Sequence, residues 1–173
     1  HHIMLATNQF DVIIIGGSFS GLSAAMALGR SLRNVLVIDS GLPCNRQTPH
    51  SHNFITQDGE RPQVIAEKAW AQTMKYDTVQ FHQGRAVGGM KNEDGFCITT
   101  EADEVFHSKK VIFASGIVDI LPDIPGFSAC WGISVIHCPY CHGFEVKGVA
   151  TGILANGDFA YHYAQLIRNW TKD

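Results

Sequence analysis

The sequence lacks both an excess of charge of one sign and any long hydrophobic run. Thirteen Lys and Arg stand against sixteen Asp and Glu, a formal net charge of −3 that excludes the basic surface typical of nucleic-acid-binding domains. The first apolar run covers only residues 12–15, far short of the roughly 18 residues of a membrane span, and it lacks the flanks of a signal peptide. We therefore expect a soluble, cytoplasmic protein with no nucleic-acid or membrane partner. His1 and His2 look like the remainder of an affinity tag.

Cysteine is scarce and unevenly spaced. The five cysteines, an odd number, stand at positions 44, 97, 130, 138 and 141, which does not fit the paired framework of a small disulfide-rich fold. Only Cys138 and Cys141 are close in sequence, in C-P-Y-C. A single C-x-x-C in a chain with few thiols predicts a reducing compartment and points to redox or metal chemistry.

The sequence does contain a strand–helix–strand pattern near its start. Residues 10–15 form a continuous apolar, β-branched run that ends at glycines, as in a strand buried on both faces of a parallel sheet. Small and apolar residues then recur at helical spacing from Gly21 to Gly29, and residues 35–38 form a second buried strand. This βαβ unit predicts an α/β fold of the Rossmann type.

The rest of the chain predicts one further helix, a small antiparallel meander and a second strand–helix pattern. Helical spacing covers residues 62–75, after a long polar loop. Asn92–Gly95 supplies a tight turn within the meander, and the proline-rich stretch 121–126 predicts a linker. The expected elements are short strands at 79–81, 86–90, 96–99 and 105–106, a buried strand at 110–115, a strand at 148–155 and a helix at 159–170.

A glycine-rich turn, G-G-S-F-S-G at residues 16–21, follows the first predicted strand. In the dinucleotide fingerprint the first glycine makes the tight turn and the third lets helix and strand approach closely, roles that Gly16 and Gly21 would fill. Ser18 replaces the second glycine, and N–H groups at the helix start would still attract a pyrophosphate. Asp39 ends the second strand at a spacing that suits a carboxylate binding ribose hydroxyls. The alternative is a purely structural turn, with Asp39 capping the next segment.

The densest cluster of reactive side chains is H-C-P-Y-C-H-G at residues 137–143. Two cysteines at this spacing can close a disulfide ring and reopen it, and the attacking sulfur must be a thiolate. His137 and His142 flank the pair, and an imidazole that titrates near neutrality can move the proton. We predict dithiol–disulfide exchange at Cys138 and Cys141.

Two alternatives stay open for this cluster. The first is a zinc site, which would need His50 and His52 to be brought in by the fold because a second pair of ligands at a suitable spacing is missing. The second is a pair of inert, buried thiols. We expect Cys44, Cys97 and Cys130 to be small buried residues without a redox role.

The ordered set of motifs resembles the low-molecular-weight thioredoxin reductases. These motifs are D-V-I-I-I-G-G-S-F-S-G-L-S-A-A, V-L-V-I-D-S-G, I-F-A-S-G, the two-proline crossover and C-P-Y-C-H-G-F-E. The chain is more similar to the relatives that handle small-molecule dithiols, the disulfide-forming oxidases of fungi and bacteria. The resemblance implies FAD in one domain, NADPH in an inserted domain that also carries the C-x-x-C, and a homodimer.

The resemblance also implies roles for individual residues. Cys138 and Cys141 would be the redox pair, and His142 would take the acid/base role that an aspartate has in thioredoxin reductases. Asn53 would lie near the isoalloxazine ring, and the backbone of Ala86 would touch adenine. The cofactor residues implied in this way are Gly16, Gly17, Ser18, Phe19, Ser20 and Gly21 in the turn, Asp39 and Ser40 after the second strand, Asn45, Arg46 and Asn53 in the long loop, then Ala86, Ala114, Ser115 and Gly116.

Two departures from the family pattern qualify this prediction. Ala155 replaces the first glycine of the expected NADPH turn, which disfavours a pyridine nucleotide and favours oxygen as electron acceptor. The chain also ends just inside the second domain, so we expect it to be part of such an enzyme.

We predict an FAD-binding domain at 10–118, a crossover linker at 119–127 and the beginning of an NAD(P)H-type, Rossmann-like domain at 128–173, with no metal. The predicted function is a flavin-dependent dithiol–disulfide oxidoreductase acting on a small-molecule or protein thiol; the alternatives are a non-catalytic nucleotide-binding module and a zinc-stabilised domain.

Overall fold

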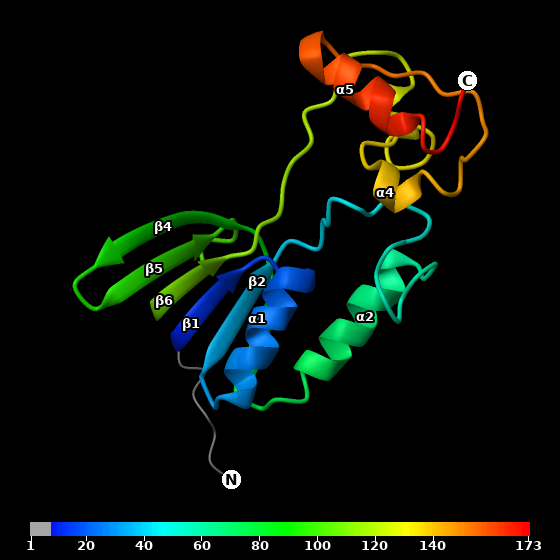
Figure 1. Cartoon of the computed structure of the whole chain (residues 1–173). Helices are drawn as coiled ribbons and strands as arrows, with labels where there is room; N and C mark the ends of the chain where they lie inside the picture. The colour runs from blue at the N-terminus through cyan, green and yellow to red at the C-terminus, as the bar shows by residue number, and fades with distance from the viewer. Residues whose placement is uncertain (1–7) are drawn as a thin grey trace. The chain divides into compact units, whose positions relative to one another are not determined.

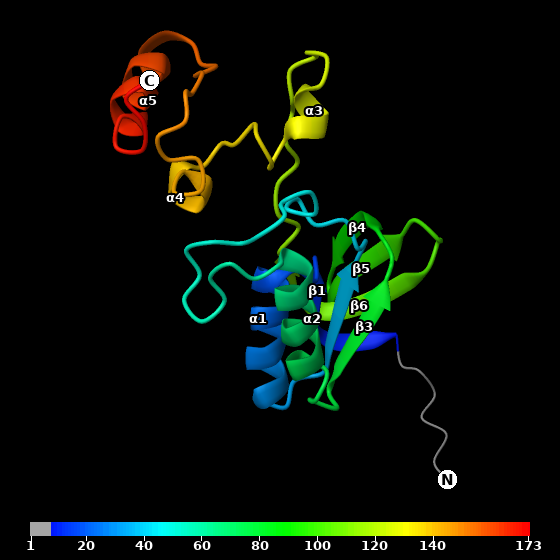
Figure 2. The same cartoon turned by 90° about the vertical axis from the view of Figure 1, so that its right-hand side faces the viewer.

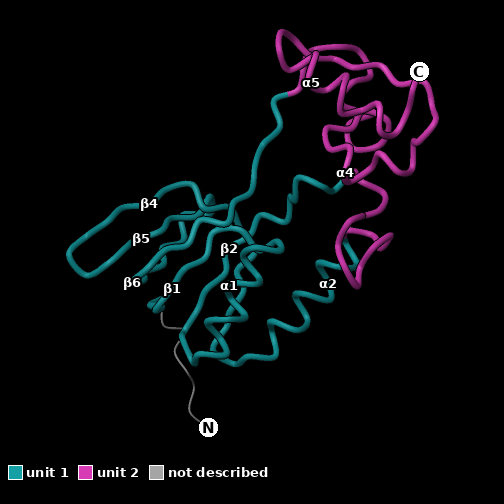
Figure 3. Tube along the Cα trace, viewed as in Figure 1, with its two compact units in different colours: residues 1–46, 63–120 teal, residues 47–62, 121–173 magenta. Residues whose placement is uncertain are grey.

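The computed structural model describes residues 8–173, so the tag interpretation of His1 and His2 lies outside the described residues. The chain divides into two compact units, coloured separately in Figure 3. Unit 1 comprises the described residues up to 46 together with 63–120, and unit 2 comprises 47–62 together with 121–173. The long loop at 47–62 therefore groups with the C-terminal part of the chain, whereas the domain boundaries expected from the sequence stay a prediction.

Unit 1 is built on one six-stranded sheet with the strand order β3-β2-β1-β6-β5-β4. The first four strands in this order run parallel, and β5 and β4 continue the sheet as an antiparallel meander. Because β2 and β6 lie on opposite sides of β1, the sheet has a topological switch point beside β1, where α/β folds bind their ligands. The strands are β1 (Gln9–Ile15), β2 (Val35–Asp39), β3 (Val79–Gln83), β4 (Ala86–Asn92), β5 (Gly95–Thr100) and β6 (Val105–Phe113).

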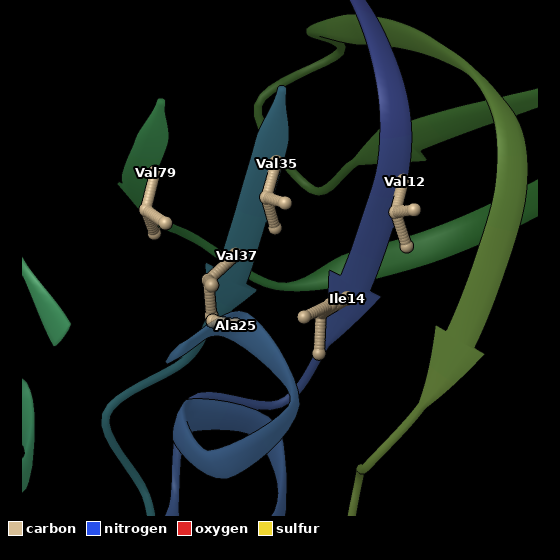
Figure 4. Packing of buried hydrophobic residues seen from close by; sticks show 6 residues of the cluster. All are labelled: Val12, Ile14, Ala25, Val35, Val37 and Val79. Carbon is tan, nitrogen blue, oxygen red and sulfur yellow. The ribbon is translucent and has the colours of Figure 1, made fainter. Parts of the chain in front are cut away.

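Two helices, α1 (Phe19–Arg30) and α2 (Pro62–Thr73), cover one face of this sheet (Figures 1 and 2). Successive side chains of a strand point to opposite faces, so the solid apolar strands bury residues on both. Ala25 of α1 packs on the valines and Ile14 shown in Figure 4, while Ile13 belongs to a second cluster with Leu36 and Ile38. Ile13 and Ile14 are fully buried, and burial of such a side chain contributes about 1.5–3 kcal/mol.

The structure confirms the βαβ start and the helix at 62–73, and it corrects three other expectations. β3 pairs in parallel with β2 rather than joining the meander, because α2 is a crossover that returns the chain in the same direction. The strands expected at 105–106 and 110–115 are one continuous strand, β6, which pairs with β1 on one side and with β5 on the other. The polar residues in the middle of β6 interrupt its apolar pattern, so the sequence suggested two strands. The strand expected at 148–155 does not form: Gly148 N–H donates to Trp170 O (2.8 Å) and Thr151 N–H to Asp173 O (3.0 Å), so the backbone bonds to the chain end instead.

Unit 2 contains three helices among irregular segments: α3 (Phe127–Cys130), α4 (Pro139–His142) and α5 (Gly157–Ile167). The loop 47–62 closes on itself through the N–H of Gly59, which donates to the carbonyl of Ser51 at 2.8 Å. Gln47 Nε2 also donates to Ser128 O (3.4 Å), and this bond ties the loop to the segment of α3. Within residues 8–173, no helix is both long enough and apolar enough to span a membrane.

Candidate functional site

The first candidate site lies in unit 1, where β1 and β6 end side by side. Gly16 follows β1 with a φ of +104°, a conformation that L side chains rarely adopt. A Cβ at this position would collide with the carbonyl oxygen of Ala114 and lie 3.0 Å from Ser115 N. Ala114 N–H in turn donates to Ile15 O at 2.7 Å. Only glycine fits here, and the fold brings together two segments of the cofactor site implied by the sequence.

Asp39, at the end of β2, holds the same turn from the other side. Its Oδ2 accepts a hydrogen bond from Gly17 N–H at 2.5 Å, and its Oδ1 accepts one from Gly41 N–H at 2.7 Å. Each carboxylate oxygen has a second lone pair, so the group can still accept hydrogen bonds from ribose hydroxyls. A Cβ at Gly17 would lie 2.9 Å from Asp39 Cβ and 2.8 Å from Phe81 Cε2, which shows how closely the turn approaches β2 and β3.

The start of α1 completes an anion-binding geometry. Ser18 is the N-cap with extended backbone, but its side chain makes no capping hydrogen bond and the first turn carries no acidic residue. The backbone of Gly21 lies so close to the turn that a Cβ at Gly21 would collide with the carbonyl oxygen of Gly16. The N–H groups and the positive end of the helix dipole therefore face the turn, an arrangement that attracts phosphate. The residues present fit the pyrophosphate and ribose of an adenine dinucleotide such as FAD.

The other implied cofactor residues are more scattered. Phe19 and Ser20 lie in the first turn of α1, Ser40 follows Asp39 and is exposed, and Gly116 follows β6 with a φ of +68°. Asn45 and Arg46 lie in the segment after β2, where Arg46 Nη1 donates to Pro43 O at 3.2 Å. Ala86 begins β4, paired with Thr100, and Asn53 belongs to unit 2. Their roles toward a cofactor stay predictions.

The second candidate site lies in unit 2 and contains a disulfide between Cys138 and Cys141, with their Cα atoms 5.3 Å apart. Cys138 is the N-cap of α4 and Pro139 occupies the first turn, where its missing N–H costs no hydrogen bond. The N–H groups of Cys141 and His142 both donate to Cys138 O at 3.2 Å. This single helical turn brings the two sulfurs and the His142 backbone together, and both cysteines are half-buried.

His142 directly follows Cys141 in the chain and is half-buried, and its pKa is lowered from the ordinary value. Burial is the main cause, because it disfavours the charged imidazolium, and the positive charges of His52 and His137 act in the same direction. The carboxylate of Glu145 opposes them. The imidazole is therefore biased toward its neutral form, which can accept a proton.

His52 and Glu145 lie near His142, and Asp58 lies on the other side of His52. The ring of His52 lies edge-on to that of His142, with centroids 6.1 Å apart. His52 Nε2 is 3.4 Å from Glu145 Oε1, and His52 Nδ1 is 3.7 Å from Asp58 Oδ1. Of these residues, only Glu145 could have been found from its place in the sequence, because it ends C-P-Y-C-H-G-F-E three residues after His142.

The remaining cysteines and histidines bear on the zinc site considered as an alternative for the C-x-x-C cluster and on the thiols expected to be buried. His137 stacks on Trp131, with ring centroids 5.3 Å apart. Cys44, Cys97 and Cys130 are free thiols, but none is buried: Cys44 is exposed, and Cys97 and Cys130 are half-buried, so the expectation of three buried residues is wrong. Within residues 8–173, no group of three or more His, Cys, Asp or Glu side chains is placed to hold a metal ion.

A mostly parallel sheet with a glycine turn at its switch point, in a chain that also carries a C-x-x-C disulfide, is typical of nucleotide-binding disulfide oxidoreductases. Residues 10–169 match the family model described as pyridine nucleotide-disulphide oxidoreductase, and the chain belongs to this family. Its thioredoxin reductase-like members are FAD-dependent.

Individual relatives agree with this assignment. Thioredoxin reductase tcpT of Claviceps purpurea is 36% identical over 157 residues, covering 89% of this chain and 49% of that protein. Thioredoxin reductase aclD of Aspergillus oryzae is 35% identical over 178 residues, covering 97% and 56%. The crystal structure of an oxidoreductase from Agrobacterium tumefaciens matches with a TM-score of 0.90 at 39% identity, covering 95% of this chain and 56% of that one. The chain thus spans about half the length of the relatives it matches.

Proposed function

We propose that this chain carries the FAD-binding turn and the redox disulfide of a flavin-dependent dithiol–disulfide oxidoreductase. The observation that carries the proposal is the closed Cys138–Cys141 disulfide beside a half-buried His142 whose pKa is lowered. A disulfide can accept two electrons from a thiol substrate, and a neutral imidazole next to it can take the proton that the thiol must lose.

The chemistry at the disulfide follows thiol–disulfide exchange. His142 accepts the proton of a substrate thiol, and the resulting thiolate attacks one sulfur of the Cys138–Cys141 bond. A mixed disulfide forms and the other cysteine sulfur leaves as a thiolate. The second substrate thiol, once deprotonated, attacks the mixed disulfide, so that the substrate leaves oxidised and the cysteine pair holds two electrons. When bound, FAD supplies the two-electron acceptor that allows the pair to close again.

The geometry of unit 1 supports the cofactor assignment. The backbone N–H groups at the start of α1 would hold the pyrophosphate, and Asp39 would accept hydrogen bonds from the adenosine ribose. We keep as predictions a homodimer, a cytoplasmic location and a small-molecule dithiol as substrate. NADPH also stays a prediction, and Ala155, which precedes α5 where the family pattern has a glycine, disfavours it.

The test is reduction of the FAD-loaded protein by a small dithiol under anaerobic conditions, followed by the visible flavin absorbance. We expect rapid bleaching, with loss of the fast phase in Cys138→Ser and Cys141→Ser. The matched control is Cys130→Ser, which alters a half-buried free thiol of unit 2 and should bleach like the parent. Equally fast bleaching in both active-pair variants would show that electrons bypass the disulfide, and the proposal would then be wrong.

A further inference from the structure

His52, from the loop 47–62, lies against both His142 and Glu145. Its ring is edge-on to His142 at 6.1 Å between centroids, and its Nε2 is 3.4 Å from Glu145 Oε1. Only 21% of its side chain is exposed. A histidine in this position was not indicated by the C-x-x-C motif, because the fold brings it in from a distant part of the chain.

Asp58, from the same loop, lies beside the ring of His52. Asp58 Oδ1 accepts a hydrogen bond from Asn53 N–H at 2.8 Å and lies 3.7 Å from His52 Nδ1. Gly59 N–H donates to Ser51 O at 2.8 Å, which closes the loop around these residues. Each ring nitrogen of His52 therefore lies within 4 Å of a carboxylate oxygen, so the ring stands between two acidic side chains.

The charged groups around His142 act on its pKa in opposite directions. A positive charge on His52 opposes protonation of His142, and so does one on His137, whereas Glu145 favours it. Glu145 is shared, because its carboxylate is also the partner of His52 Nε2. An ion pair between His52 and Glu145 thus adds a repelling charge near His142 and engages the carboxylate that would otherwise attract its proton.

We propose that His52, held between Glu145 and Asp58, is a positioning residue that keeps His142 unprotonated and ready to accept the proton of the incoming thiol. The inference rests on the proposed function for its consequence, since an unprotonated His142 matters only if thiols react at Cys138–Cys141. The electrostatic effect that it describes concerns only the protonation of His142, and this protonation can be measured without catalytic turnover.

The test compares His52→Gln, which keeps a polar side chain and removes the charge, with Glu145→Gln, which removes the carboxylate. The first readout is the NMR titration of the His142 ring in the oxidised, FAD-loaded protein, assigned with His142→Gln. We expect His52→Gln to move the His142 midpoint to higher pH and Glu145→Gln to move it to lower pH. His50→Gln is the matched control, because His50 lies in the same loop with its Nδ1 bonded to Gly59 O (3.0 Å) and should leave the midpoint unchanged.

The second readout is the pH dependence of anaerobic reduction by the dithiol. The acid limb should follow the His142 midpoint, and each pH unit of upward displacement lowers the rate below the limb roughly tenfold. A purely structural role for His52 would lower the rate at every pH without moving the limb. Unchanged midpoints, or midpoints that move in the same direction in the two variants, would overturn the inference.

These readouts also separate the two proposals. If Cys138→Ser and Cys141→Ser leave flavin bleaching intact, the proposed function fails, and the NMR midpoints still decide what His52 does to His142. If instead bleaching depends on the cysteines and the midpoints do not move, the function stands and the positioning role is wrong. Should His52→Gln not fold, Glu145→Gln tests the same balance from the other partner.

Discussion

Replacing Gly16 by Ala tests whether the turn after β1 has the close approach on which a dinucleotide site depends. Gly16 has a φ of +104°, and its Cβ would collide with the carbonyl oxygen of Ala114, which is backbone and cannot rotate away. The matched variant is Gly59→Ala, because Gly59 has a φ of +80° and a Cβ added there would meet no atom within 4 Å. The two substitutions share the strain of a positive φ and differ in the collision.

The expected magnitudes follow from these two contributions. A non-glycine residue at positive φ costs about 1–3 kcal/mol, and this is the whole effect expected of Gly59→Ala. Overpacking against fixed backbone adds about 1–3 kcal/mol, so Gly16→Ala should lower the free energy of unfolding by about 2–6 kcal/mol. Each kcal/mol lowers the midpoint of thermal unfolding by about 2–4 °C for a chain of this size.

Thermal unfolding without cofactor and a flavin fluorescence titration measure the two consequences. Gly16→Ala should unfold at a clearly lower temperature than Gly59→Ala and bind FAD at least about tenfold more weakly, which corresponds to about 1.4 kcal/mol. Gly59→Ala should bind FAD like the parent. Equal midpoints for the two variants, together with unchanged FAD affinity in Gly16→Ala, would mean that the turn does not make the contact described here.

Three further predictions concern the same two sites. Asp39→Asn should weaken FAD binding about tenfold or more in a fluorescence titration. The carboxylate of Asp39 accepts hydrogen bonds from the N–H groups of Gly17 and Gly41, and the NH₂ group of an asparagine would face one of these donors instead. Unchanged affinity would mean that Asp39 is not part of the cofactor site. Ser18→Gly, which restores the second glycine of the fingerprint, should cost only a few tenths of a kcal/mol and leave FAD affinity within about twofold, because the Ser18 side chain makes no capping bond. The free energy of unfolding, measured against pH, should fall as the pH drops below 6.5, the ordinary pKa of histidine, because the unfolded chain then binds a proton that folded His142 resists. His142→Gln should flatten that part of the profile, and a parent profile with the opposite slope would contradict the lowered pKa.

The sequence predicted the elements whose pattern is local. Residues 10–15 and 35–38 are solid apolar runs, and β1 and β2 form over them because such runs can be buried on both faces. The antiparallel turn at Asn92–Gly95 was equally readable and joins β4 to β5. The direction of β3 and the continuity of β6 were not readable, because both depend on which strand lies alongside, and a pairing partner leaves no mark within the strand itself.

The sequence by itself determined the glycine turn, Asp39 and the Cys138–Cys141 pair, since each is a short-range arrangement set by turn geometry or by spacing along the chain. Only the tertiary structure decided that Gly16 lies against Ala114 and that His52 and Asp58 join His142 and Glu145 in unit 2. The physical reason is that the pKa of a buried imidazole depends on charges within a few ångströms in space, whatever their separation along the chain.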